Sequence, residues 1–204
     1  MKRKLLSAIL PLFSIAAIPG HASAAASGTT LQNLNTAYQR ECNAANRYEN
    51  FARQADSAGF NEIARLLRAT AASEAIHRDI QKRAIVKLGA NPETFKLQEI
   101  IPATTAENLK SAINDESEDS TKLYPAFLAT AKADNSKPAI RAFNYALAGE
   151  KHHAEYFQQA LAQIDSKNPI TCYVCKDCGL MLTKLPAKKC PVCREGLKEF
   201  KKID

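Results

Sequence analysis

Apolar and small residues recur at intervals of three or four positions along most of the chain, from about residue 29 to residue 165. This spacing puts the apolar side chains of each segment on one face, which is typical of an amphipathic α-helix. Four such sets follow one another, over Leu31–Ala55, Phe60–Leu88, Leu109–Thr130 and Ile140–Ile164. The pattern predicts four long helices that bury their apolar faces against one another.

The connections between these sets predict how the helices are arranged. Gly59 separates the first two sets and Asp134–Pro138 the last two, so each pair is expected to form a tight antiparallel hairpin. The stretch Gly89–Thr105 is long enough to run the length of a bundle, and Thr104 or Thr105 can cap the helix that follows. Two hairpins joined by one long crossover predict an all-α, ferritin-like four-helix bundle.

A second, small domain is expected after the bundle. The polar segment Ser166–Pro169 ends in a helix breaker, and the residues after it include five of the six cysteines and no long helical pattern. We therefore expect a bundle over residues 25–167 and a cysteine-rich domain over residues 168–204.

Acidic residues interrupt the apolar face of every predicted helix, which is costly unless the acids have partners. The residues concerned, with two histidines at i+3 of a glutamate, are Glu41, Glu74, His77, Glu116, Asp119, Glu150 and His153. All seven lie 14 to 20 residues from the nearer tight turn, or roughly 21–30 Å along a helix. They are therefore expected to meet in one layer.

Two Glu-x-x-His pairs, with single acids on the other two helices, predict a dinuclear carboxylate site. Carboxylate oxygens with two imidazoles suit iron or manganese. The alternative is an ion-paired polar layer, which would need Lys or Arg on the buried faces, and none occurs there. His152 lies off the buried face and is expected at the surface.

The cysteine-rich domain contains two Cys-x-x-Cys knuckles, formed by Cys175, Cys178, Cys190 and Cys193. Such knuckles predict a tetrahedral site of four thiolates that binds iron or zinc, and the spacing does not choose between them. The alternative is a pair of disulfides. Cys42 and Cys172 lie outside this set; they are expected to be free thiols, with a disulfide between them as the alternative in an oxidising compartment.

Composition and charge change this picture at the N-terminus. Lys2–Lys4, a short apolar run and Ala22–Ala24 are typical of a secretory signal peptide over residues 1–24, so we expect export to the periplasm. Cleavage after Ala24 would reduce the net charge from +7 to +4. Because the basic residues are scattered, nucleic-acid binding is not expected. No apolar run reaches the ~18 residues of a membrane span.

The sequence resembles the rubrerythrin family over essentially the whole chain after residue 24. The resemblance is carried by Glu41–Tyr48, Ser73–His77, Tyr124-Pro125, Gly149–Glu155 and the knuckle segment Tyr173–Cys193. It implies a non-haem di-iron peroxidase that reduces hydrogen peroxide to water. Electrons would arrive through an Fe(Cys)₄ centre, usually from the partner subunit of a head-to-tail homodimer. By position, the layer residues other than Asp119 match the family's iron ligands, and Tyr48 and Tyr124 match tyrosines beside them.

Two departures from the family pattern carry expectations of their own. Asp119 stands where the family has a longer glutamate ligand, so we expect it on the wall of the site as a weak or water-mediated ligand. Export would imply metal loading outside the cytoplasm and an electron donor that the sequence does not identify. The competing functions are ferrous-iron oxidation or iron handling, and a non-enzymatic metal-binding scaffold with a structural zinc ribbon.

Overall fold

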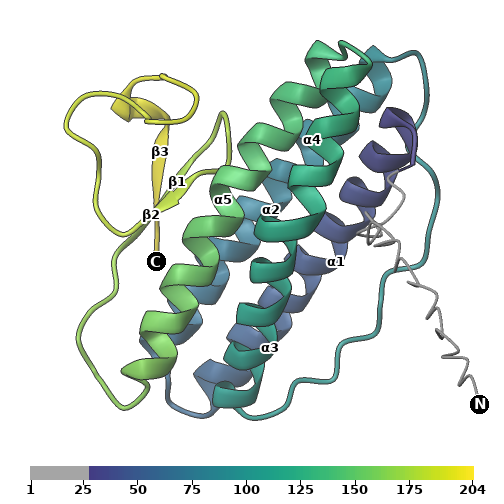
Figure 1. Ribbon diagram of the computed structural model, residues 1–204. Coiled ribbons are helices and arrows are strands. Elements are labelled where there is room, and N and C mark those ends of the chain that lie inside the picture. Colours follow the sequence, from purple (N-terminus) through teal and green to yellow (C-terminus); the bar gives the residue numbers. More distant parts are fainter. Residues whose placement is uncertain (1–27) are drawn as a thin grey trace, which may run out of the picture.

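The structure is a computed structural model that describes residues 28–204, so the expected signal peptide lies outside the described residues. Its larger part is a bundle of helices arranged as two hairpins (Figure 1). The elements of the bundle are α1 (Thr30–Ser57), α2 (Asn61–Lys87), α3 (Thr105–Glu118), a π-helix η1 (Asp119–Leu123), α4 (Tyr124–Ala133) and α5 (Lys137–Ala162). The predicted ferritin-like fold is confirmed.

Local sequence signals account for where the helices begin and turn. Thr29 starts α1 with a capping box in which its side chain and that of Gln32 satisfy each other's backbone N–H groups. Thr104 and Glu107 form the same box at α3, so the acid that completes this cap is Glu107. Gly59, between α1 and α2, has a φ of 81°, a left-handed conformation that favours glycine.

The third helix of the sequence pattern is interrupted. After α3, five residues form the π-helix η1 before α4 continues to Ala133. A π-turn inserts an extra residue into a helical turn, and such turns occur frequently at functional sites. Here the insertion begins at Asp119, three residues after Glu116, so it changes which residues of this segment face the bundle interior.

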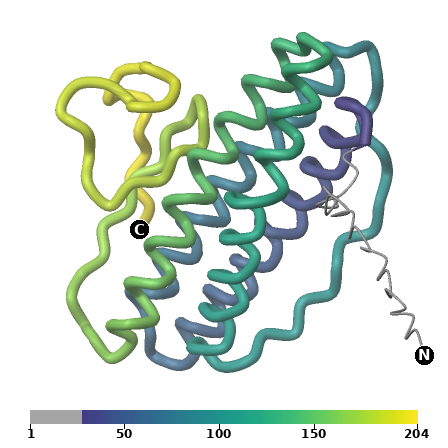
Figure 2. Tube along the Cα trace, in the orientation of Figure 1, coloured from purple at the N-terminus to yellow at the C-terminus, as the bar shows by residue number. Residues whose placement is uncertain are grey.

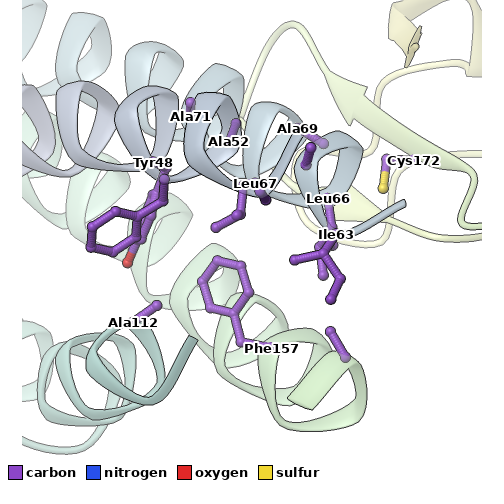
Figure 3. Close-up of a cluster of buried hydrophobic side chains, with 14 of the residues drawn as sticks. Tyr48, Ala52, Ile63, Leu66, Leu67, Ala69, Ala71, Ala112, Phe157 and Cys172 are labelled. Carbon is purple, nitrogen blue, oxygen red and sulfur yellow. The ribbon is translucent and has the colours of Figure 1, made fainter. Parts of the chain in front are cut away.

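Two apolar clusters pack the bundle. One includes Tyr48, Leu67 and Phe157, with small alanines that let the helices approach (Figure 3). The other includes Leu34 and Phe143, together with residues of α4. The two clusters share no buried residue, and the acids of the sequence pattern lie in neither of them.

The crossover between α2 and α3 runs along the outside of the bundle past α1 (Figures 1 and 2). Asparagines of α1 bind its extended backbone: the Glu93 amide donates to Asn35 Oδ1 at 3.0 Å and the Gln98 amide to Asn43 Oδ1 at 3.0 Å. Asn46 donates back to the Gln98 carbonyl at 3.2 Å. These side chains satisfy backbone groups that a segment without regular structure leaves open.

The C-terminal module is a small antiparallel sheet of β1 (Cys172–Cys175), β2 (Met181–Leu182) and β3 (Phe200–Ile203), in the order β2-β1-β3, with a short 3₁₀-helix η2 (Leu197–Glu199). It lies beside α5 and α2 (Figure 1). Val174 and Met181 join an apolar cluster of the bundle, so the module is packed onto it. Among the described residues, no helix combines the length and apolar character that crossing a membrane requires.

Candidate metal centres

Six of the seven predicted site residues meet in a buried layer between the helices. They are Glu41 of α1, Glu74 and His77 of α2, Glu116 of α3, and Glu150 and His153 of α5. Each is at most 3% exposed. Buried carboxylates at this density are stable only with cations or protons to compensate them.

The layer divides into two sets of possible ligands. One atom from each of Glu41, Glu74, His77 and Glu150 lies within 4.8 Å of the others, and the same holds for Glu74, Glu116, Glu150 and His153. Glu74 and Glu150 belong to both sets. The two sets would therefore hold two metal ions, with Glu74 and Glu150 available to both ions and one further carboxylate and one imidazole available to each.

The donor set fits two iron ions. Four carboxylates and two imidazoles match the preference of iron for mixed oxygen and nitrogen ligands. Two buried carboxylate oxygens, Glu74 Oε1 and Glu116 Oε2, have no hydrogen-bond partner. Such atoms are expensive in a protein interior, and metal binding would remove the cost.

In the metal-free protein, protons compensate the carboxylates. Burial and the Glu74 charge raise the pKa of Glu41 well above its usual value, and burial and the neighbouring glutamates do the same for Glu150. Burial opposes the charged forms of His153 and Glu74, but their attraction outweighs it. The pKa of His153 is raised to about 10, and that of Glu74 is lowered.

Two buried tyrosines bind the carboxylates that belong to one set only. The Tyr48 hydroxyl donates to Glu116 Oε1, and the Tyr124 hydroxyl donates to Glu41 Oε1. Burial and the adjacent carboxylate raise the pKa of both phenols well above the usual value, so they remain proton donors. Each bond connects the first helical hairpin to the second, and it orients one oxygen of the carboxylate while the other remains available.

Asp119 is the predicted residue that the layer does not include. It lies at the wall of a cavity of about 60 Å³ that Glu41, Glu74, Glu116 and Glu150 also line. Its carboxylate accepts two hydrogen bonds from Arg40, one of them from Nε at 3.2 Å. Although Arg40 favours the charged form, burial dominates and raises the pKa of Asp119 to about 7.

The second centre is formed by the cysteine knuckles. The sulfurs of Cys175, Cys178, Cys190 and Cys193 all lie within 4.8 Å of one another, and two pairs are 3.6 Å apart. All four are free thiols, which overturns the alternative of two disulfides, and Cys42 and Cys172 are free as well. A convergent set of four thiolates fits a single iron or zinc ion.

The two centres are in contact through residues that the sequence analysis missed. Ser73 Oγ lies 3.0 Å from His153 Nε2 and 2.5 Å from the carbonyl oxygen of Gly179. A Cβ on Gly179 would lie 2.5 Å from His77 Nε2, and a Cβ on Gly149 would lie 2.4 Å from His77 Cε1. A glycine inside a predicted helix, as at Gly149, is the one signal that indicates such a close approach.

His152, which the sequence places off the buried face, lies apart from both centres. Its side chain is 36% exposed and 3.8 Å from Glu155, and its ring stacks on Tyr156 with ring centroids 5.9 Å apart. It contributes to neither set of ligands.

Comparison with known proteins gives one family. The sequence model of the rubrerythrin family matches residues 32–161. Nigerythrin of Nitratidesulfovibrio vulgaris is 32% identical over 171 residues, which cover 84% of this chain and 85% of that protein. Rubrerythrin-2 of Clostridium acetobutylicum is 32% identical over 176 residues, which cover 84% and 94% of the respective chains.

Solved structures agree with the sequence relatives. A mixed-valence structure of nigerythrin aligns with a TM-score of 0.80 at 31% identity, over 89% of this chain and 90% of that one. A fully reduced, all-ferrous nigerythrin structure aligns with a TM-score of 0.79 at 30% identity, over 89% and 91%. Bacterioferritin of Mycobacterium tuberculosis, at 22% identity and a TM-score of 0.61 over 67% of this chain, shares the fold alone.

Proposed function

The chain belongs to the rubrerythrin family, and on that premise we propose that it is a di-iron peroxidase that reduces hydrogen peroxide to water and protects against oxidative stress. The observation that supports this most is the pair of ligand sets sharing Glu74 and Glu150. Two iron ions held there would supply the two electrons that cleavage of one O–O bond requires. Reduction of one peroxide molecule consumes two electrons and two protons and yields two water molecules.

The residues around the layer have separate tasks in this proposal. Glu41, Glu74, His77, Glu116, Glu150 and His153 would hold the metal ions. Tyr48 and Tyr124 orient carboxylates and keep their protons. The cavity beside the layer, at about 60 Å³, has room for water-sized molecules, which suits peroxide.

The cysteine module would supply electrons one at a time, with iron as its metal. The charge distribution supports an acidic donor protein. Residues 168–204 contain eight Lys and Arg against four Asp and Glu, whereas residues 28–167 contain 17 of each. All eight cations are exposed, and most of them make no ion pair with another described residue. A basic module would attract an acidic carrier and orient it toward the cysteine site.

Two further expectations remain proposals. One is a head-to-tail homodimer, in which the module of one chain would contact the bundle of the other. Exchange of a small domain between identical chains preserves its contacts, because the same surfaces meet. The other is export to the periplasm, which rests on residues 1–24 alone.

The test is peroxide consumption by protein isolated with its native metals. We expect iron in both centres, steady-state turnover with a reduced donor, and water as the product. Cys175→Ser should lower steady-state turnover strongly, while a pre-reduced sample still consumes one equivalent of peroxide. Cys42→Ser, outside both centres, should behave as the unmodified protein.

Three outcomes would contradict the peroxidase proposal. Unchanged steady-state turnover in Cys175→Ser would remove the electron-supply role of the module. Zinc in the cysteine site of natively produced protein would indicate a structural ribbon. Rapid oxidation of added ferrous iron without peroxide turnover would favour iron handling.

A further inference from the structure

Ser73 lies where the bundle and the cysteine module meet, one residue before Glu74 on α2. Its side chain is fully buried. A serine in a helix commonly returns its hydroxyl to the carbonyl four residues earlier, and Thr70 does this with Leu66 at 3.1 Å. Ser73 instead bonds across the domain boundary to the Gly179 carbonyl at 2.5 Å.

The positions of the two nitrogens of the His153 ring show which groups donate and which accept the hydrogen bonds at this contact. His153 Nδ1 faces Glu74, Glu116 and Glu150 at 3.1–3.4 Å, so it is the nitrogen available to a metal. Its Nε2 therefore carries the proton and donates to Ser73 Oγ, 3.0 Å away. The Ser73 hydroxyl in turn donates to the Gly179 oxygen. A continuous hydrogen-bonded connection thus joins the His153 imidazole to the residue next to Cys178.

The close approach on the module side is specific to this geometry. Gly179 has a φ of 81°, and a Cβ there would come within 2.5 Å of His77 and 3.2 Å of the Ser73 carbonyl. The backbone of the first cysteine knuckle therefore packs closely against α2 at Gly179, where it contacts both His77 and Ser73. The buried His77 Nε2 has no hydrogen-bond partner, so Ser73 supplies the hydrogen-bonded connection at this contact.

We propose that Ser73 is a positioning residue for electron transfer, which holds the Gly179 carbonyl of the cysteine module against the His153 side of the di-iron site. The inference rests on the proposed redox function of the two centres. In each event the metal of the cysteine site loses one electron and the di-iron site gains one, with no bond formed or broken. Two events supply the two electrons that one peroxide molecule consumes. The role is the same whether the module comes from its own chain or from a partner.

The experiment compares Ser73→Ala with Thr70→Val in the full, iron-loaded protein. Thr70 lies one turn away, and its hydroxyl is 3.7 Å from Met181 of the module, but it bonds neither His153 nor Gly179. A light flash in the presence of a photoreductant reduces the cysteine-bound iron, whose colour returns as the electron passes on. No peroxide is present, so the result does not depend on the peroxidase reaction.

We expect Ser73→Ala to slow the return of colour by about tenfold or more, since loss of a partner that orients a metal ligand typically costs about 10- to 100-fold in metal affinity or activity. Thr70→Val should leave the rate within about twofold of the unmodified protein. The proposal would be overturned if Ser73→Ala returned its colour as fast as the unmodified protein, or if Thr70→Val slowed the return as much as Ser73→Ala. Redox titration of both centres gives their reduction potentials in each variant, so the electron-transfer rates can be compared at a known driving force.

A second measurement requires no electron transfer, and its first readout uses the unmodified protein. In zinc-loaded protein, nitrogen-15 NMR should show the His153 Nε2–H as a hydrogen-bonded proton protected from solvent exchange. Ser73→Ala should shift this resonance and speed its exchange, whereas Thr70→Val should do neither. A His153 Nε2 proton that exchanges freely in the unmodified protein would overturn the proposal on its own.

Discussion

Arg40 and Asp119 form an ion pair at the rim of the carboxylate layer, and this pair competes with any metal for the Asp119 carboxylate. Asp119 belongs to neither set of possible ligands, and the Arg40 guanidinium binds its carboxylate through two nitrogens. A carboxylate engaged in this way would have to give up charge-assisted hydrogen bonds to reach a metal. Its side chain is also one methylene shorter than the glutamate of the family pattern.

We therefore predict that Asp119→Asn retains about two iron ions per chain in the layer, because the six other ligands remain. Glu116→Gln, the control, removes a charged ligand from a single set and should lower iron content markedly. Elemental analysis and metal titration measure both. Loss of iron in Asp119→Asn comparable to that in Glu116→Gln would show that Asp119 is a direct ligand.

The protons that compensate the carboxylate layer when no metal is bound predict a pH dependence of the metal-free protein. The folded-state pKa values of His153, about 10, and of Glu41 and Glu150 lie above their unfolded values. At these three groups the folded chain binds more protons than the unfolded chain, so their contribution to stability falls as pH rises. For His153 the loss runs from about pH 6.5 to about pH 10.

Thermal unfolding of chelator-treated protein should therefore show a lower midpoint at pH 9.5 than at pH 6. In the metal-loaded protein this decrease should be much smaller, because metal ions replace the protons. Metal binding at pH 7 should also release protons, which a weakly buffered solution reports directly. A metal-free midpoint that rises between pH 6 and pH 9.5 would contradict the assignment.

At the scale of elements, Gly179 in the first cysteine knuckle allows the module to pack closely against α2. Gly179→Ala should be destabilising for two reasons: a left-handed φ costs about 1–2 kcal/mol for other residues, and the new Cβ would strike His77. Gly59→Ala is the matched control, because Gly59 has the same φ of 81° with no atom within 4 Å of the added Cβ. Gly179→Ala should lower the unfolding midpoint more, and equal losses in the two variants would contradict the contact.

The sequence predicted the helices and the layer because both depend on local periodicity. The Glu-x-x-His pairs on α2 and α5 are visible at fixed spacing, and their depth follows from the rise of a helix. The π-helix was not predictable, since one inserted residue barely changes the apolar pattern. The bonds of Ser73 and Arg40 were missed because their partners lie 106 and 79 positions away, so only the tertiary fold defines them.

For the whole molecule, the concentration of positive charge on the module predicts salt-dependent reduction. In protein with iron in the cysteine site, an anionic reductant such as dithionite should reduce that iron several-fold more slowly at 0.15 M than at 0.01 M salt, because the screening length falls from about 30 Å to about 8 Å. Reversing the charges of Lys188 and Lys189 should have a similar effect at low salt. Reversing Lys110 and Lys132 on the bundle is the control, and an equal effect there would show that module charge has no special role.

The N-terminal sequence pattern predicts that the protein is processed and exported from the cytoplasm. If residues 1–24 are removed by a signal peptidase, the mature protein should begin at Ala25 and fractionate outside the cytoplasm. N-terminal sequencing of protein from fractionated cells measures this. Met1 on protein from the cytoplasmic fraction would contradict export.

The sharing of ligands between the hairpins has a consequence for how the bundle stays closed. Each ligand set draws on both hairpins: α1 and α2 with α5 in one, and α2 with α3 and α5 in the other. A bound ion therefore acts as a cross-link between distant parts of the chain, and it removes the entropy that the intervening loop would gain on opening. The crossover at residues 90–104 would not have to hold the hairpins in register alone, because metal ions held by Glu74 and Glu150 together with residues of α1 and α3 would help to fix it from inside. Metal loading would therefore add to the stability that the apolar clusters already give the bundle, and removal of the metals should make separation of the hairpins easier.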